Sequence, residues 1–335
     1  MKLPGRAARP VRASLTLAGI LTAVLTGSLL VSGCGEDGLD PRTDNPFAAR
    51  ALLVDTGSRT AQAAAAAQQA GDTRAAEVFG RLAEVPQAIW LTPERTPPGQ
   101  VGEYVEGVVR AADDADRLPV LVVYGIPDRD CSGGYSAGGL DPSAYLAWVQ
   151  EVADSASSGE LAVTILEPDA LASAQECPDP AQRVELVGGA VDVLAEAGVA
   201  TYLDGGHSHW LAPPDMAELL IDAGIDRVRG FATNVSNHQL DEDEVAYAER
   251  LSALLDGAHY VVDRGRNGVG AAEEWCNPDG RAFGLEPGLV PGEGALDAYL
   301  WVKPPGESDG PCNGGPPAGD FWAERTLEMA ARSGW

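Results

Sequence analysis

Short apolar runs alternate along the chain with segments in which apolar residues recur every three or four positions. Tyr145, Trp148 and Val152 illustrate the second pattern, which is typical of a helix with one buried face. The apolar runs are nearly continuous, as in strands that helices cover on both faces. They occupy residues 87–91, 118–124, 161–166, 199–203, 228–233, 260–262 and 298–302.

Seven strand-and-helix units of this kind predict an α/β protein with a parallel sheet, most economically a closed or nearly closed barrel. A doubly wound open sheet is the alternative. Its nucleotide-binding form is disfavoured, because no GxGxxG motif follows an early strand. We expect one large domain over residues 46–335, a length that such barrels commonly reach.

A different pattern stands at the N-terminus. Four cations precede an uncharged apolar run over residues 15–31, which predicts an export signal over residues 1–33. Residues 31–34 resemble the lipobox of bacterial lipoproteins, so we expect cleavage before Cys34 and a lipid on this cysteine. An uncleaved anchor and secretion with a free thiol are the alternatives. Residues 34–45 are acidic and rich in turn formers, which predicts a flexible tether.

The composition narrows the choice of partner. The chain holds 23 Lys and Arg against 50 Asp and Glu, a formal net charge of −27, and the predicted signal contributes four of the cations and no acid. So acidic a surface repels nucleic acid and anionic membranes, which leaves a lipid at Cys34 as the expected membrane contact. We therefore expect a neutral substrate. No repeat or heptad indicates an obligate oligomer, so we expect a monomer.

Four cysteines follow Cys34, an even number in a chain predicted to be exported. We expect two disulfides, most simply Cys131 with Cys177 and Cys276 with Cys312. Their spacing contains no CxxC motif, so a zinc site is not expected. We expect no other metal and no cofactor.

Polar, carboxylate and aromatic residues follow the predicted strands, at the ends where parallel barrels hold their active sites. In the central example, Pro168 ends a strand after Glu167 and leaves Asp169 on a stiff loop. Solvation of a strand end explains one such site but not their repetition. The residues are Trp90, Tyr124, Asp130, Asp169, Asp204, His207, Trp210, Asn234, Asn237, Asp263, Arg266, Lys303, Glu307 and Asp309.

Carboxylates beside Trp and Tyr, with Asn and His donors and no GxSxG motif, suit a carbohydrate ligand. Sugar rings offer apolar faces for stacking and hydroxyls for hydrogen bonds. Hydrolysis of a glycosidic bond needs one carboxylic acid to protonate the leaving oxygen, and a second carboxylate that acts as nucleophile or through water. A neighbouring carboxylate can keep the acid protonated near neutral pH, because two close negative charges resist forming together.

Seven motifs occur in order along the chain and resemble those of glycoside hydrolase family six, the cellulases. They are VVYGIPDRDC (122–131), LEPD (166–169), DGGHS (204–208), ATNVSN (232–237), RNG (266–268), EWCNP (274–278) and WVKPPGESDG (301–310). The resemblance implies a distorted, incomplete, TIM-like barrel of seven parallel strands that hydrolyses β-1,4-glucan with inversion. It also implies the disulfide pairing given above and no metal.

The resemblance assigns catalytic roles to three aspartates. Asp169 matches the proton donor, and Asp130 matches the aspartate that holds the donor's pKa up and helps to organise water. Asp309 matches the aspartate most often proposed as the base. The alternative is a chain of waters that reaches Asp130 with the help of Ser136. Inversion requires the two carboxylates to lie about 6.5 to 9.5 Å apart, which leaves room for a water.

Other matched residues imply substrate contacts. Tyr124 matches the tyrosine under the distorted sugar at the cleavage point. For the aromatic residues, an ordinary core position is the alternative. Arg266 and Lys303 are implied as charge partners of Asp309. Contacts with sugar hydroxyls are implied for Asp204, His207, Asn234, Lys303 and Glu307, and stacking for Trp90, Trp210 and Trp275.

The segments between Asp169 and the C-terminus are compact, which leaves little room for long loops over the cleft. We therefore expect an open cleft and internal cleavage, an endoglucanase rather than a processive cellobiohydrolase. A glucan-binding lipoprotein without activity and a metal-dependent hydrolase are the alternatives from other classes. Gly125, Arg264-Gly265 and His209 depart from the family's usual residues, and we expect them to change the shape of the sugar subsites.

Overall fold

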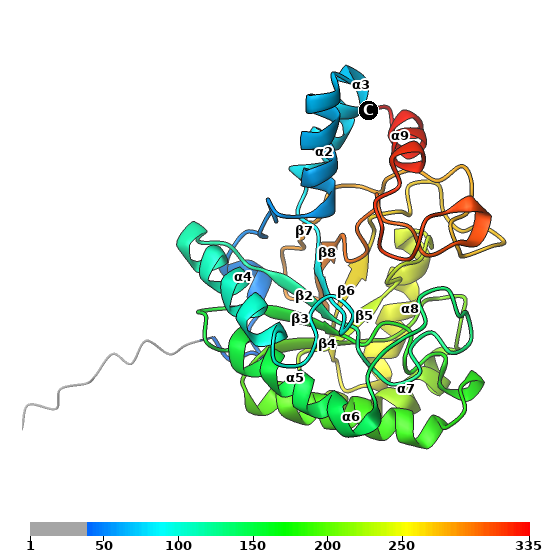
Figure 1. The fold of residues 1–335 in the computed structure, drawn as a ribbon. Helices are drawn as coiled ribbons and strands as arrows, with labels where there is room; N and C mark the ends of the chain where they lie inside the picture. Colours follow the sequence, from blue (N-terminus) through cyan, green and yellow to red (C-terminus); the bar gives the residue numbers. More distant parts are fainter. Residues whose placement is uncertain (1–38) are drawn as a thin grey trace, which may run out of the picture. The chain divides into compact units, whose positions relative to one another are not determined.

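The computed structural model describes residues 39–335 (Figure 1). The predicted export signal over residues 1–33 and the predicted lipidation site at Cys34 lie outside these residues. Within the described part, no helix is long and apolar enough to cross a membrane.

One curled sheet of eight strands forms the centre of the fold, in the order β1-β2-β3-β4-β5-β6-β8-β7. Seven strands are parallel, and the short β7 pairs antiparallel with β8 at the edge. The strands are β1 (Ile89–Leu91), β2 (Val120–Val123), β3 (Val163–Leu166), β4 (Ala200–Asp204), β5 (Gly230–Thr233), β6 (His259–Asp263), β7 (Gly288–Leu289) and β8 (Leu296–Leu300). The predicted distorted, incomplete barrel with seven parallel strands is confirmed, and β7 is an addition that the apolar pattern did not indicate.

Helices α4 to α8 follow strands and cover the outside of the sheet (Figure 1). Helices α2 and α3 precede the first strand and pack with the C-terminal α9 around a separate apolar cluster. The helices are α1 (Pro46–Ala49), α2 (Arg59–Ala70), α3 (Thr73–Ala83), α4 (Val101–Ala115), α5 (Pro142–Ala156), α6 (Pro180–Glu196), α7 (Pro213–Asp222), α8 (Asp241–Leu254) and α9 (Ala323–Arg332). Short 3₁₀ turns occupy Ala174–Glu176 (η1), Ile225–Arg227 (η2) and Cys312–Gly314 (η3).

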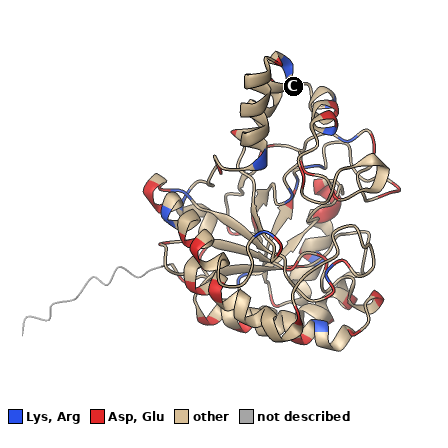
Figure 2. Ribbon diagram, viewed as in Figure 1, with Lys and Arg blue, Asp and Glu red and all other residues tan. Residues whose placement is uncertain are grey.

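Local sequence explains where these helices begin. Asp179 caps α6 by accepting a hydrogen bond from the amide of Gln182, and Pro180 follows at a position that needs no amide donor. Asp and Glu residues lie along the outer helices (Figure 2). Four of them stand in the first turn of α8, where the helix dipole favours negative charge.

Both faces of the sheet are buried, which explains the continuous apolar runs. In β2, Leu121 and Val123 pack against the outer helices, while Val120 and Val122 fill the barrel interior. Successive side chains of a strand point to opposite faces, so a strand buried on both faces shows no alternation of apolar and polar residues.

The barrel stays open between β1 and β8, which do not pair with each other. Two hydrogen bonds cross the gap: the Ala88 amide donates to the Trp301 carbonyl at 3.0 Å, and the Trp90 indole donates to the Val302 carbonyl at 2.8 Å. We call this gap the seam. A cavity beside it is lined by residues of β1, of the start of α2 and of the loop after β8.

A buried charge cluster lies at the amino end of the barrel. Asp297 on β8 accepts two hydrogen bonds from Arg229, at 2.8 and 2.9 Å, and one from the Tyr202 hydroxyl at 2.5 Å. Both charged side chains are at most 3% exposed. Burial alone would raise the pKa of Asp297, but hydrogen bonds from His259, Arg229 and Tyr202 hold it below its ordinary value.

The N-terminal segment is attached to this end of the barrel. The Arg42 guanidinium donates to the Asp226 carbonyl at 2.9 Å, and Arg229 donates to the Arg42 carbonyl at 3.1 Å. Asn45 caps α1 by accepting from the Phe47 amide at 2.9 Å. Hydrogen bonds that composition does not reveal thus fix the chain from Arg42 onward, and the tether over residues 34–45 stays a prediction that lies partly outside the described residues.

Candidate active site

Two adjoining cavities, of about 290 and 450 Å³, form a cleft at the carboxyl ends of the strands. Four residues line both cavities and so mark the junction: Asp130, Asp169, Ser236 and Trp275. The first half of the cleft also includes Trp90, Glu94, Arg95, Tyr124, Arg129, Tyr135, Ser136, Lys303, Glu307 and Asp309. The second half includes Ser173, Glu176, His207, His209, Trp210, Asn237, His238 and Gln239.

Asp169 lies in the turn that follows β3. Its φ of 68° is left-handed, and its amide donates to the Asp204 carboxylate at 2.9 Å, which fixes the turn. Burial, and then the negative charges of Asp204 and Asp130, raise the pKa of Asp169 well above its ordinary value. Asp169 therefore keeps a proton at pH values at which an exposed aspartate is ionised.

Glu167 is almost fully buried beneath this turn. Its Oε1 accepts a hydrogen bond from the Gly125 amide at 2.9 Å, which ties the end of β3 to the end of β2. Burial raises the pKa of Glu167 to about 7. Because it lines neither half of the cleft, its role is to position the loops that carry Asp130 and Asp169.

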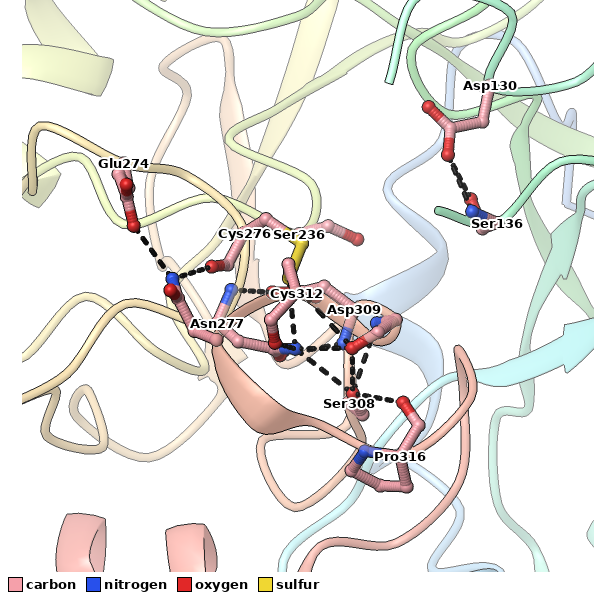
Figure 3. The surroundings of a disulfide bond; sticks show 12 residues. Asp130, Ser136, Ser236, Glu274, Cys276, Asn277, Ser308, Asp309, Cys312 and Pro316 are labelled. Carbon is pink, nitrogen blue, oxygen red and sulfur yellow. Dashed lines mark hydrogen bonds between the residues drawn. A yellow bond between two sulfur atoms is a disulfide. The ribbon is translucent and has the colours of Figure 1, made fainter. Parts of the chain in front are cut away.

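Asp130 lies on the loop after β2 and is held by Ser136 (Figure 3). Its Oδ2 accepts from the Ser136 amide at 2.6 Å and from the Ser136 hydroxyl at 3.1 Å. The same hydroxyl lies 2.9 Å from the Tyr124 hydroxyl. Burial and the charge of Asp169 raise the pKa of Tyr124, so its phenol stays protonated. The three predicted residues thus form one connected hydrogen-bonded chain.

Asp309 is surrounded by hydrogen-bond donors and cations, in contrast to Asp169, which lies among carboxylates. Nη1 of Arg266 donates to both of its carboxylate oxygens, at 2.8 and 2.9 Å, and the Asn277 amide donates to its Oδ2 at 3.0 Å. Burial would raise the pKa of Asp309, but Arg266 and then Lys303 outweigh it and hold the pKa below the ordinary value. Asp309 is therefore ionised under conditions in which Asp169 is protonated.

Trp90, Lys303 and Glu307 form a wall of the first half of the cleft. The Trp90 ring packs edge-to-face against Tyr124, with ring centres 5.1 Å apart, and Nζ of Lys303 lies 5.4 Å from the Trp90 ring. Burial raises the pKa of Glu307, against the charges of Lys303 and Arg95. The wall combines an aromatic face with groups able to bond hydroxyls.

His207, Trp210 and Trp275 line the second half. The rings of His207 and Trp210 pack with their centres 5.5 Å apart, and Trp275 is 45% exposed. Burial lowers the pKa of His207 to about 4, so its imidazole is neutral at neutral pH. The structure therefore brings the three residues to the same cleft as the aspartates.

Two predicted sugar contacts, Asp204 and Asn234, do not reach the cleft. Asp204 is 2% exposed, and its Oδ2 accepts from the amides of Asp169 and Gly206. Asn234 is fully buried, and its amide group bonds to the backbone of Gln239 and to the Asp263 carbonyl. In this structure the two side chains hold the loops together from beneath, and a contact of either one with sugar stays a prediction.

The departures from the family pattern are explained mostly by packing. A Cβ on Gly125 would lie 2.6 Å from the ring of the buried Trp148, so the backbone leaves no room for a side chain. Arg264 pairs with Asp241 and lies 3.9 Å from the Tyr299 ring, outside the cleft. Of the departures, His209 lines the cleft, whereas Gly125 and Arg264 do not, and an effect on subsite shape stays a prediction.

Tyr135 and Arg129 are among the cleft residues that were not predicted as site residues. Tyr135 packs against Trp275 with ring centres 5.7 Å apart, so the loops after β2 and β6 meet at the junction of the two cavities. The expectation of an open cleft did not anticipate this contact. Arg129 donates to the carbonyls of Tyr124 and Ser136, at 2.8 and 2.9 Å, and braces the loop. The sequence offered a signal for each residue. Tyr135 is an aromatic residue directly before Ser136, and Arg129 is a cation within the motif over residues 122–131.

Two disulfides fix the loops that carry these groups. Cys131 follows Asp130 directly and pairs with Cys177, and Cys276 pairs with Cys312 beside Asp309 (Figure 3). The predicted pairing is confirmed. Among residues 39–335, no group of three or more His, Cys, Asp or Glu side chains is placed to hold a metal ion.

The chain is similar to known cellulases. Endoglucanase A from Cellulomonas fimi is 42% identical over 258 residues, which are 76% of this chain and 56% of that protein. The chain thus spans little more than half of that relative. A probable 1,4-β-D-glucan cellobiohydrolase C from Aspergillus fumigatus is 32% identical over 71% of this chain and 63% of that protein.

A solved structure gives the same indication. The endoglucanase Cel6 from Mycobacterium tuberculosis, in complex with a methyl-cellobiosyl-thio-cellobioside, is 41% identical with a TM-score of 0.81, over 87% of this chain and all of that chain. The sequence profile of glycosyl hydrolases family 6 matches residues 47–333. The resemblance that the seven motifs indicated is confirmed: the chain belongs to glycosyl hydrolases family 6.

Proposed function

We propose that this chain hydrolyses internal β-1,4-glucosidic bonds of cellulose or related β-glucans with inversion. The observation that carries the proposal is that Asp169 and Asp309 line one cavity with opposite electrostatic surroundings. One carboxyl is kept protonated and the other ionised, the pair of states that an inverting glycosidase requires. The relatives named endoglucanase, at 41 and 42% identity, favour internal cleavage over the cellobiohydrolase at 32%.

Asp169 supplies the proton. The carboxyl transfers it to the glycosidic oxygen as the bond from that oxygen to the anomeric carbon breaks, and Asp169 becomes a carboxylate. Asp130 and Asp204 favour the protonated state before the reaction, because they would otherwise face a third negative charge. A water attacks the anomeric carbon from the opposite face of the ring and gives its proton to a base.

We assign the base to Asp309. Arg266 and Asn277 hold its carboxylate in one orientation, and Oδ1 accepts one hydrogen bond, which leaves a lone pair for a water. The alternative runs through water to Asp130, whose Oδ2 is held by Ser136. Rescue by azide separates the two: if Asp309 is the base, Asp309→Ala regains turnover with azide and forms a glycosyl azide, whereas a rescue confined to Asp130→Ala selects the water route.

The remaining residues hold the sugar rings. Tyr124 and Trp90 offer aromatic faces in the first half of the cleft, beside the polar groups of Lys303 and Glu307. In the second half, Trp210 and Trp275 stack on sugar rings. The neutral imidazole of His207 donates a hydrogen bond to a sugar hydroxyl or accepts one from it. Sites on both sides of the junction suit a glucan chain that extends in both directions from the cleaved bond.

The function is tested by following viscosity and new reducing ends on carboxymethyl cellulose, for the wild type and Asp169→Asn, with EDTA present. We expect an early collapse of viscosity with few new ends, and an inactive variant. Steady release of cellobiose with little loss of viscosity would support a processive cellobiohydrolase. Loss of activity in EDTA would support a metal-dependent hydrolase, and binding without turnover a glucan-binding lipoprotein.

We also propose that the enzyme is exported and held at the cell surface by a lipid on Cys34. We propose that it is a monomer. The two disulfides support an oxidising compartment. Fractionation of cells that express the wild type and Cys34→Ser tests the anchor: the wild type should sediment with membranes and the variant should not. Light scattering of the purified protein tests the oligomeric state.

A further inference from the structure

The cleft does not end at Trp90. A second cavity of about 300 Å³ adjoins it beside the seam, and Trp90, Arg95 and Glu307 line both. The seam cavity exists because no strand pairs with the open edge of β1, so residues of β1, of the start of α2 and of the loop after β8 face one another. The catalytic proposal does not use this space.

Polar groups of the seam cavity have spare hydrogen-bonding capacity. Within residues 39–335, Glu307 interacts with Lys303 and Arg95 through charge alone, and Arg95 itself gives one hydrogen bond, to the Gly319 carbonyl at 3.1 Å. A carboxylate and a guanidinium that are not saturated by protein partners can bond the hydroxyls of a ligand in this cavity.

Tyr104, near the start of α4, continues this path. It is 43% exposed and lines both the seam cavity and a larger groove of about 880 Å³ beside α4, which Gly107 and Val108 also line. The aromatic residues thus recur along connected spaces: Trp275 at the middle of the cleft, Trp90 between the cleft and the seam cavity, and Tyr104 between the seam cavity and the groove. Repeated aromatic faces with hydroxyl-bonding groups between them suit a chain of sugar rings.

We propose that a β-1,4-glucan chain continues from the cleft past Trp90 through the seam cavity, where Arg95 and Glu307 bond the hydroxyls of a further glucose unit, and then over Tyr104 into the groove beside Gly107. This distal subsite rests on the proposed function, because its ligand is the remote part of the same substrate. It makes the enzyme select long chains, because short oligosaccharides fill the cleft without reaching Tyr104.

Calorimetric binding to the full chain with Asp169→Asn tests the distal subsite without turnover. The ligands are cellotetraose and cellohexaose, and the variants to add are Tyr104→Ala and Gly107→Phe. A side chain on Gly107 meets no atom within 4 Å and would project into the groove. Gly80→Phe is the matched control, because Gly80 also lies in a helix with free space around it and lines none of the cavities described here.

We expect cellohexaose to bind about tenfold more tightly than cellotetraose, a difference of about 1.4 kcal/mol. Tyr104→Ala and Gly107→Phe should abolish this preference and leave cellotetraose binding unchanged, and Gly80→Phe should change neither. Equal loss for both ligands, or no loss for cellohexaose in Tyr104→Ala, would overturn the distal subsite while leaving the proposed function intact. If neither oligosaccharide binds, the proposed function fails, and the distal subsite fails with it.

Discussion

The two ends of the barrel place buried aspartates in opposite surroundings. At the amino end, Asp297 accepts three hydrogen bonds from Arg229 and Tyr202, and its pKa is held down. At the carboxyl end, Asp169 faces Asp130 and Asp204, and its pKa is raised. An aspartate thus stabilises the fold at the amino end. At the carboxyl end, an aspartate is kept protonated for the reaction, which lowers the stability of the fold.

Asp297 and Asp169 also change the stability of the fold with pH in opposite directions. Asp297 has a lowered pKa in the folded state, so its contribution to stability is present above the ordinary aspartate pKa and is lost as the pH falls through the folded value. Asp169 has a raised pKa in the folded state, so its contribution is largest in acid and is lost as the pH rises toward the folded value. Near neutral pH, one end favours folding and the other opposes it.

The largest effect is expected from Asp169→Asn. The amide cannot supply the proton, so kcat/KM on carboxymethyl cellulose should fall by about 10³ to 10⁴-fold. The unfolding free energy near pH 7 should stay the same or rise, because asparagine never ionises among the other carboxylates. Reducing-end assays and urea denaturation check the two expectations, and a less stable, active variant would contradict both.

Next comes Asp297→Asn, which should leave catalysis intact and weaken the fold. The substitution leaves the guanidinium of Arg229 buried without its counter-ion, which costs about 3 to 5 kcal/mol. Urea denaturation near pH 7 measures the loss, and kcat at a temperature where the variant is still folded should match the wild type. If kcat fell tenfold in fully folded protein, the division of roles between the two ends would be wrong.

A smaller effect is expected when Asp309 loses its cation. In Arg266→Met the pKa of Asp309 should rise, so the acid limb of the pH profile of kcat/KM should move upward by about 1 to 3 pH units. Arg266→Lys should restore part of the shift, since it keeps the charge. An acid limb that stays in place in both variants would show that Asp309 does not control it, and would favour the route through Asp130.

The smallest effect is expected for an exposed ion pair, which serves as the reference. Glu106 and Arg110 lie 3.6 Å apart on α4, and both side chains are more than half exposed. Glu106→Gln should change the unfolding free energy by less than about 0.5 kcal/mol and leave kcat unchanged. A larger loss would mean that the cost in Asp297→Asn cannot be ascribed to burial.

The strands were predictable because burial on both faces leaves continuous apolar runs. For β8 the predicted range, 298–302, lay two residues late, since Asp297 interrupts the apolar run while pairing with Arg229. The two-residue β7 has too little sequence to give a pattern. Helices α2 and α3 precede the repeating strand-and-helix units, so counting those units did not predict them.

The candidate site was predictable in its location and in part of its detail. Asp130, Asp169 and Asp309 follow strands and line the cleft, but Asp204, the last residue of β4, and Asn234, directly after β5, bond the loops beneath it. Position along the chain does not separate the two cases, because the direction of a side chain after a strand depends on the left-handed turns of the loop. Asp169 and Asn234 both have positive φ, and one faces the cleft while the other is buried.

The disulfides have a consequence for how the protein is made. Each bridge joins a cysteine to the next one along the chain after Cys34, Cys131 to Cys177 and Cys276 to Cys312. With the proposed lipid on Cys34, a chain that is threaded across a membrane from its N-terminus presents the other four cysteines to an oxidant in that order, so each thiol meets its correct partner first. Production in a host compartment that oxidises thiols should therefore give the correct bridges without an isomerase to rearrange them.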